Sequence, residues 1–215
     1  MVMSRSRRGP RLGRSRLLVG VAAALVRVAC GPDDGGDSTL TGIVRDPAPV
    51  VDGTVLPSVA DEGEIVEFRA RQGGLQAVYF GYTSCPDVCP TTLADLTVAL
   101  RKLPDDQSAM VDTVMVTVDP DRDLDILADY VRSFIPDADA AGTDDDDLLA
   151  EAAEPFGVVY SVTALDDGSI GVEHSPFLYV VNDRGELVVT WQFGETSDNM
   201  AADMATLLER GGASA

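Results

Sequence analysis

The sequence predicts an α/β domain in which a central mixed sheet is flanked by helices. Three observations support this prediction. Strand and helix patterns alternate through the middle of the chain, which implies strands that pair in parallel. Two later strand patterns are separated by a short turn, as in an antiparallel hairpin, and a helical pattern closes the chain. The 215 residues are enough for one such domain with a sizeable core and a leader.

The first half of the domain is predicted from two continuous apolar runs, at residues 75–82 and 111–118. Such runs suit strands that are buried on both faces. Three helices are predicted from apolar residues at three- and four-residue spacing. They cover residues 93–103, 124–134 and 148–156, and the first two end at Pro104 and Pro136.

The second half of the domain changes character. Strands are predicted at residues 158–162, 177–181 and 186–192, and the last two are joined by a turn at residues 182–185. A closing helix then follows around Met204. Parallel units followed by an antiparallel hairpin and a terminal helix form the order of a thioredoxin-like fold. A cysteine motif at the end of the first central strand is consistent with this fold.

Cys85 and Cys89 lie four residues apart, where the first apolar strand turns into a helix. This spacing can put both sulfurs on one side of the first helical turn, where the helix N-terminus lowers the pKa of a thiol. A structural disulfide is the alternative, but closing so short a loop removes little unfolded-state entropy. We therefore interpret the two cysteines as a redox or metal-binding pair. Soft sulfur ligands select copper(I) or zinc over magnesium and calcium.

His174 is the chain's single histidine and lies 85 residues beyond Cys89. In thioredoxin-like proteins the loop before the third central strand runs beside the cysteine motif and often carries a cis-proline. Pro176 is the candidate for that position, which would place His174 over the thiols. Glu173 could orient its ring, but we interpret it as an exposed acid. The alternative is an ordinary surface or core histidine. Two thiolates and an imidazole predict a copper site, because closed zinc sites use four protein ligands.

The composition is strongly acidic, with a formal net charge of −20 and a pI near 4.1. Such a charge makes nucleic acid an unsuitable partner. The four aspartates at residues 144–147 resemble a metal cluster, but they open a predicted helix, where acidic side chains complement the helix dipole. We therefore interpret them as a helix start.

Residues 1–29 are predicted to be an export signal, because an arginine-rich segment precedes the apolar run at residues 17–26. Cys30 follows directly and resembles the lipid-attachment site of bacterial lipoproteins, although Arg27 stands where that pattern usually has Leu or Val. Plain secretion is the alternative. Residues 30–50 are predicted to be a flexible tether, and residues 51–215 the domain. We therefore expect an extracytoplasmic protein, anchored to the outer face of the bacterial cell membrane through a lipid on Cys30.

Three segments together resemble a known family. Residues 79–93, which read YFGYTSCPDVCPTTL, resemble the signature of the Sco/SenC copper proteins, which assist assembly of the binuclear copper centre of cytochrome c oxidase. Residues 118–123 and 173–175 are similar to two further family segments. The resemblance spans roughly residues 50–210. It departs from the family pattern at residues 124–125, where the family often has Thr-Pro, and at Glu173, where it often has Asp.

The resemblance implies a copper metallochaperone that carries one copper ion per chain, as Cu(I) or Cu(II), on Cys85, Cys89 and His174. Its partners would be the copper-site subunit of cytochrome c oxidase or another copper carrier. The resemblance also permits a thiol-disulfide oxidoreductase that uses Cys85 and Cys89 to keep partner cysteines reduced. A redox or copper sensor without transfer activity is the third alternative.

Overall fold

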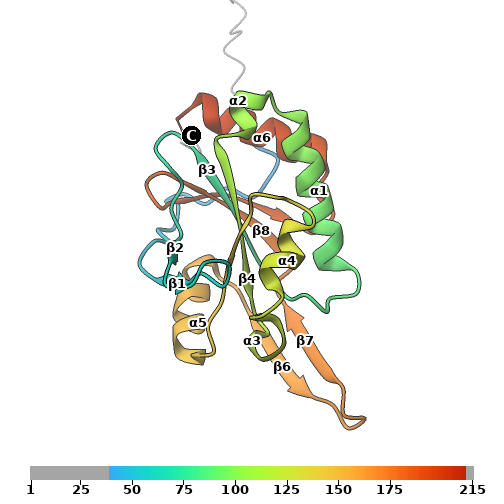
Figure 1. The fold of residues 1–215 in the computed structure, drawn as a ribbon. Coiled ribbons are helices and arrows are strands. Elements are labelled where there is room, and N and C mark those ends of the chain that lie inside the picture. The colour runs from blue at the N-terminus through green and yellow to red at the C-terminus, as the bar shows by residue number, and fades with distance from the viewer. Residues whose placement is uncertain (1–38, 212–215) are drawn as a thin grey trace, which may run out of the picture. The chain divides into compact units, whose positions relative to one another are not determined.

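The computed structural model describes residues 39–211 of the chain, and a mixed five-stranded sheet forms its centre (Figure 1). The strand order is β5-β4-β3-β8-β9. Strands β3, β4 and β5 are parallel, whereas β8 is antiparallel to both β3 and β9. These strands are β3 (Leu75–Gly81), β4 (Val111–Thr117), β5 (Asp139–Ala141), β8 (Phe177–Asn182) and β9 (Leu187–Gln192). The predicted mixed α/β architecture is confirmed.

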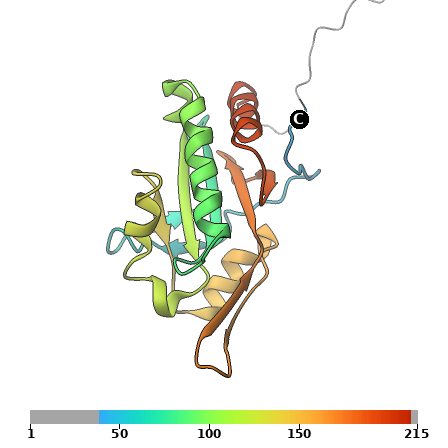
Figure 2. The same cartoon turned by 90° about the vertical axis from the view of Figure 1, so that its right-hand side faces the viewer.

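Helices cover both faces of this sheet. On one face lie α1 (Val88–Lys102), α4 (Leu127–Arg132) and α6 (Ser197–Glu209), and Figure 2 shows α1 and α6 side by side. The leucines predicted to form one face of α1 are buried here at positions 93 and 96. The other face is covered by α5 (Asp146–Ala153), the 3-10 helix Glu154–Phe156, and a small antiparallel sheet. That sheet consists of β1 (Val55–Pro57) and β2 (Ile65–Glu67). The core therefore has two parts, one on each face of the central sheet.

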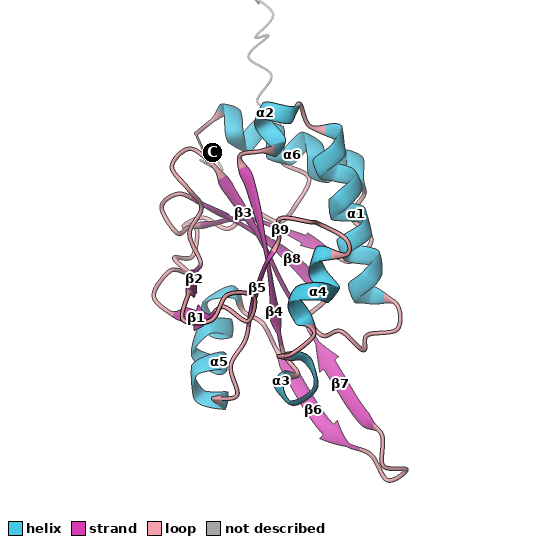
Figure 3. Cartoon of the chain, in the orientation of Figure 1, coloured by secondary structure: helices cyan, strands magenta, loops and turns pink. Residues whose placement is uncertain are grey.

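The remaining elements are short. Helix α2 (Asp105–Ser108) follows α1, and α3 (Pro120–Asp123) follows β4. Strands β6 (Tyr160–Ala164) and β7 (Ile170–His174) form a separate antiparallel hairpin that extends away from the central sheet (Figure 3).

Of the helix predicted over residues 124–134, the structure keeps α4 at residues 127–132, and a separate short helix, α3, ends just before the predicted range at Asp123. The break lies at Ile126, whose φ of −124° and ψ of −11° depart from helical values. Just before it, Asp123 is fully buried and its carboxylate is held by Thr83 and Thr117. Helix α3 is therefore fixed to the ends of β3 and β4 by polar contacts, which the spacing of apolar residues does not reveal.

The predicted strand at residues 158–162 begins two residues later, as β6, and pairs with β7 outside the central sheet. Strand β7 was not predicted at all. The turn between the two strands is marked by Gly168, whose φ of 83° lies in the left-handed region that glycine favours.

The chain is ordered before the predicted domain boundary at residue 51. Ile43 pairs with Thr190 of β9, and Val50 bridges to Glu186. The buried Asp203 carboxylate accepts hydrogen bonds from the backbone N–H of Thr41 at 2.8 Å and from Trp191 Nε1 at 2.9 Å. The part of the predicted tether from Thr41 to residue 50 therefore packs on the domain.

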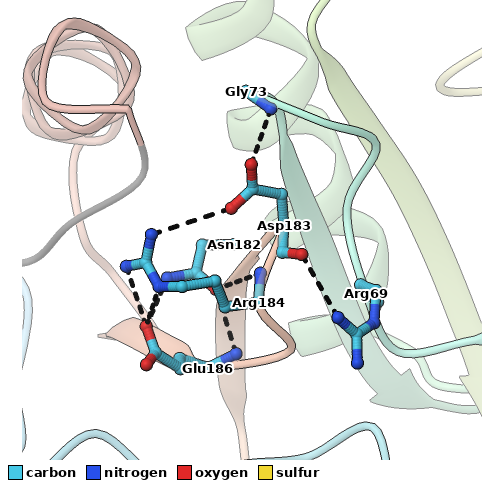
Figure 4. A network of polar contacts seen from close by, with 6 residues as sticks. All are labelled: Arg69, Gly73, Asn182, Asp183, Arg184 and Glu186. Carbon is cyan, nitrogen blue, oxygen red and sulfur yellow. Dashed lines mark hydrogen bonds and ion pairs between the residues drawn. The ribbon is translucent and has the colours of Figure 1, made fainter.

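The predicted turn between β8 and β9 is confirmed, and a polar network holds it (Figure 4). Asn182 Oδ1 accepts hydrogen bonds from the backbone N–H groups of Arg184 and Glu186 at 2.9 and 3.0 Å. Asp183 Oδ2 accepts one from the N–H of Gly73 at 2.8 Å. An Asn side chain that bonds to the backbone ahead of it is typical of tight turns.

Candidate metal centre

The cysteine motif lies at the carboxyl end of β3, where the chain enters α1. Cys89 is in the first turn of α1 and is fully buried, whereas Cys85 is half-buried. Asp87 occupies the N-cap position but makes no capping hydrogen bond with its side chain. Instead the backbone N–H of Cys89 donates to Cys85 Sγ at 3.2 Å. The sulfur of Cys85 thus satisfies one of the N–H groups that a helix start leaves open.

His174 reaches the thiols from the end of β7. Its Nε2 lies 3.5 Å from Cys89 Sγ, and its Nδ1 lies 3.1 Å from the carbonyl oxygen of Ser175. When Nδ1 carries the proton and donates to that carbonyl, Nε2 presents its lone pair to the sulfurs. The ligand atoms of Cys85, Cys89 and His174 all lie within 4.8 Å of one another. Segments 85 residues apart in sequence are thus brought together at one point.

One expectation about His174 needs correction. The Ser175–Pro176 bond is not cis, because Asp46–Pro47 is the one cis peptide bond in residues 39–211. His174 is positioned by the end of a β-strand rather than by a cis-proline loop. The carbonyl of Ser175 contacts the ring at Nδ1, and Glu173 is exposed, as interpreted from the sequence.

The expected lowering of a thiol pKa is wrong for Cys89. Burial raises the pKa of the Cys89 thiol to about 12. Burial also lowers the pKa of His174, against weaker opposing effects of backbone hydrogen bonds. Desolvation disfavours the charged form of each group, and here it outweighs the helix dipole. The metal-free site therefore favours a neutral thiol and a neutral imidazole, and a bound cation would supply the charge that the Cys89 thiolate needs.

Aromatic rings enclose the imidazole. The rings of Tyr79 and Tyr82 meet the ring of His174 edge to face, with centroid separations of 6.1 and 5.7 Å. Such contacts favour one orientation of the imidazole. Gly81 leaves room for this packing, because a Cβ there would lie 2.7 Å from Tyr79 Cε1 and 3.2 Å from Cys89 Sγ.

Comparison with known proteins agrees with this geometry. The sequence profile of SCO1/SenC proteins matches residues 57–209. The chain belongs to the SCO1/SenC family. An SCO2-like protein of Rickettsia prowazekii is 29% identical over 172 residues, which cover 79% of this chain and 82% of the relative. The apo Sco1 protein of Thermus thermophilus has a similar structure, with a TM-score of 0.67, 31% identity, and coverage of 80% of this chain and 99% of that one. A copper-bound ScoI structure from Bradyrhizobium japonicum has a TM-score of 0.61 and 27% identity, and covers 71% and 95% of the two chains.

An open cavity gives access to the centre of this SCO1/SenC chain. Its volume is about 430 Å³. It is lined by Tyr82, Cys85, Pro86, Asp87, Val88, Val172, Glu173, His174 and Pro176. Cys89 is absent from that lining. An incoming ligand would therefore reach Cys85 and His174 first.

A buried acid supports the cysteine loop and was not singled out by the sequence analysis. Asp123 is completely buried, and its carboxylate accepts hydrogen bonds from the Thr83 N–H at 2.9 Å, the Thr83 hydroxyl at 2.5 Å and the Thr117 hydroxyl at 2.8 Å. It thereby connects the end of β4 to the segment that leads into Cys85. Its position after a predicted buried strand was the available signal, since parallel strands end at a common edge.

The four aspartates at residues 144–147 do not form a metal site in the structure. Asp145 is the N-cap of α5, and its Oδ1 accepts hydrogen bonds from the N–H groups of Asp147 and Leu148, both at 3.1 Å. The helix-start interpretation is confirmed. Among residues 39–211, the group with metal-ligand geometry is that of Cys85, Cys89 and His174.

The predicted export signal and Cys30 lie outside the described residues. Within residues 39–211, no helix combines the length and apolar character needed to cross a bilayer.

Proposed function

We propose that this SCO1/SenC protein binds one copper ion through Cys85, Cys89 and His174 and delivers it to the binuclear copper site of cytochrome c oxidase. The convergence of two sulfurs and one imidazole nitrogen within 4.8 Å carries this proposal. Thiolate and imidazole ligands suit copper, and relatives of this chain have been solved with copper bound. Three protein ligands leave a coordination position open for exchange with an acceptor.

The arrangement supports transfer as well as binding. Cys89 lies at the floor of the site, while Cys85 and His174 line the open cavity. A ligand from the acceptor can therefore displace the imidazole first, while the buried sulfur still holds the ion. Copper keeps its oxidation state during this exchange, and each new bond to the acceptor replaces one bond to this chain.

Copper stoichiometry tests the binding proposal. We expect one Cu(I) per reduced chain after anaerobic loading, and none in a Cys85→Ser, Cys89→Ser double variant. In full-length chain produced without lipidation, Cys30→Ser is the matched control, because it removes a thiol outside the proposed site and should leave the stoichiometry unchanged. Equal copper content in the double variant and the wild type would refute the proposed site.

A thiol-disulfide oxidoreductase is the second candidate, and the free thiols of Cys85 and Cys89 favour it. The Cys85 thiolate would attack a partner disulfide, and Cys89 would then release the reduced partner as the Cys85–Cys89 disulfide forms. Both electrons come from these two thiols. His174→Ala separates the candidates, since it should weaken copper binding while leaving disulfide exchange possible. If this variant lost tight copper binding but still supported oxidase assembly fully, thiol reduction would be the better assignment.

We also propose that the protein works outside the cytoplasm, held at the outer face of the bacterial membrane by a lipid on Cys30. The arginine-rich segment, the apolar run at residues 17–26 and the cysteine that follows support this location.

A further inference from the structure

The β6–β7 hairpin has two chemically different faces. Its register pairs Tyr160 with His174, Val162 with Val172, and Ala164 with Ile170. Side chains alternate between the faces of a strand, so these six side chains share one face. That face is apolar apart from the Tyr160 hydroxyl and the imidazole of His174. The opposite face carries Ser161, Thr163, Gly171 and Glu173, with the exposed Leu165 beside Gly171 near the tip.

The apolar face is covered at its base and open towards its tip. Tyr160 and Val172 pack partly against the core, on the side of the sheet that α5 covers. Farther out, the exposed fractions of Val162 and Ile170 are 45% and 39%, and Ala164 is exposed. The hairpin forms a sheet of two strands only, and it extends away from the rest of the described fold (Figure 1). A contiguous exposed apolar strip of this kind marks an interaction surface more often than scattered exposed residues do.

Acidic side chains predominate in the chain around this face, although Arg122 lies near Tyr82 of the cavity lining. No Lys or Arg occurs between Arg132 and Arg184. Asp166 and Asp167 are exposed at the hairpin tip, and Asp87 and Glu173 line the cavity beside His174. A partner that packs against this surface gains from basic residues around its contact area, because complementary charges raise the association rate and exclude wrong partners.

We propose that the apolar face of the β6–β7 hairpin is the docking surface for the protein that receives the copper, a partner with an apolar strip bordered by Lys and Arg. This inference rests on the proposed copper-transfer function. His174 stands at the base of the same face, so an acceptor whose ligand reaches the copper must lie against the hairpin. Val162 and Ile170 are two and four residues from the Tyr160–His174 pair along their strands, about 7 and 13 Å at the usual rise. Both are within the footprint of an ordinary protein interface.

Transfer kinetics with two acceptors test this assignment. The acceptors are the soluble copper-site domain of the organism's own cytochrome c oxidase and a small Cu(I) chelator, and the donor is the copper-loaded protein. In Val162→Glu and Ile170→Glu we expect transfer to the protein acceptor to slow on the order of ten-fold, because a charge is placed in the contact. Transfer to the chelator should be unchanged, since the copper site itself is intact. Thr163→Glu, on the opposite face of β6, is the matched control and should behave like the wild type.

Two further measurements test whether the slowing comes from the contact rather than from misfolding of the hairpin. Val162→Thr and Ile170→Thr keep β-branched side chains and should give a smaller slowing, which checks that the effect is not misfolding of the hairpin. Raising the NaCl concentration should slow transfer to the protein acceptor but not to the chelator.

The outcomes separate the two proposals. If the wild type binds no copper, the proposed function fails. If it binds and transfers copper but all hairpin variants transfer at the wild-type rate, only the docking assignment is overturned. A third outcome also overturns it: the Glu variants convert a wild-type dimer to a monomer in sedimentation without slowing transfer. That result would make the face an interface between two copies of this chain.

Discussion

The position of the Cys89 sulfur depends on the absence of a side chain at Gly81. A Cβ at this position would lie 2.7 Å from Tyr79 Cε1, which is closer than packed atoms tolerate, and 3.2 Å from Cys89 Sγ. The ring and the sulfur are both buried, so neither can move into solvent. Gly81 is therefore part of the support of the site, although it contributes no ligand atom.

We predict that Gly81→Ala lowers the free energy of unfolding by about 1–3 kcal/mol, as overpacking of a core does, and weakens copper binding. Urea denaturation and Cu(I) competition with a chelator measure the two effects. Gly53→Ala is the control, because a Cβ at Gly53 would meet no atom within 4 Å. Unchanged stability and affinity in Gly81→Ala would show that the packing around the sulfur is not tight.

The lowered pKa of His174 predicts how the metal-free protein responds to acid. The unfolded chain takes up a proton on this imidazole near its ordinary pKa of 6.5, while the folded chain resists protonation because the ring is desolvated. The folded protein therefore loses stability as the pH falls below about 6.5 and through the lower folded pKa.

In His174→Gln this contribution is absent, so we expect its free energy of unfolding to fall less between pH 7.5 and pH 5 than that of the wild type. Chemical denaturation at a series of pH values checks this. Parallel pH profiles for the two proteins would contradict the assigned burial of the ring.

At the scale of elements, the apolar pattern was sufficient to predict those helices and strands that bury a whole face or both faces. Strands β3 and β4 are continuous apolar runs, α1 has its leucines at helical spacing, and the turn after β8 carries Asn182 and Gly185. These elements were predicted within a few residues. The apolar pattern did not predict the helix boundaries where polar contacts fix the backbone. Asp123, which ends α3 and bonds to Thr83 and Thr117, is the example.

The site, too, was predictable from the sequence only in part. Cys85, Cys89 and His174 could be named from residue chemistry and from a family resemblance, but the means of bringing them together could not. The sequence predicted a cis-proline loop at Pro176, whereas the structure uses the end of β7, a five-residue strand that was not predicted. The burial of Cys89 was also not visible in the sequence. From its position at a helix start alone, we expected a lowered thiol pKa, whereas burial raises it.

Because Asp123 connects α3 to the segment that leads into Cys85, we predict that Asp123→Ala weakens the copper site although Asp123 contributes no ligand. Its removal leaves the N–H and hydroxyl of Thr83 and the hydroxyl of Thr117 without their acceptor, at a cost of about 1–3 kcal/mol. Copper affinity should fall as well, because the loop before Cys85 is no longer fixed. Thermal unfolding and Cu(I) competition measure both. Asp121→Ala, an exposed acid in the same helix, should change neither, and a wild-type affinity in Asp123→Ala would show that the tie does not position the sulfur.

At the scale of the whole molecule, a lipid on Cys30 would hold the protein at the membrane, where an oxidase subunit is accessible. We expect intact-mass analysis of membrane-extracted protein to show a chain that begins at Cys30 and carries a diacylglyceryl group. Cys30→Ala should be recovered without that mass increment. A soluble chain cleaved elsewhere, or one that retains Met1, would contradict the anchor.

The central claim is that two sulfurs and one imidazole of a single chain hold the copper ion. X-ray absorption spectroscopy of the Cu(I)-loaded protein tests it most directly, because it identifies the atoms bound to the metal. We predict a first shell of two sulfurs and one nitrogen, from which His174→Ala removes the nitrogen while both sulfurs remain. A shell without sulfur, or one that is identical in the wild type and His174→Ala, would contradict the account.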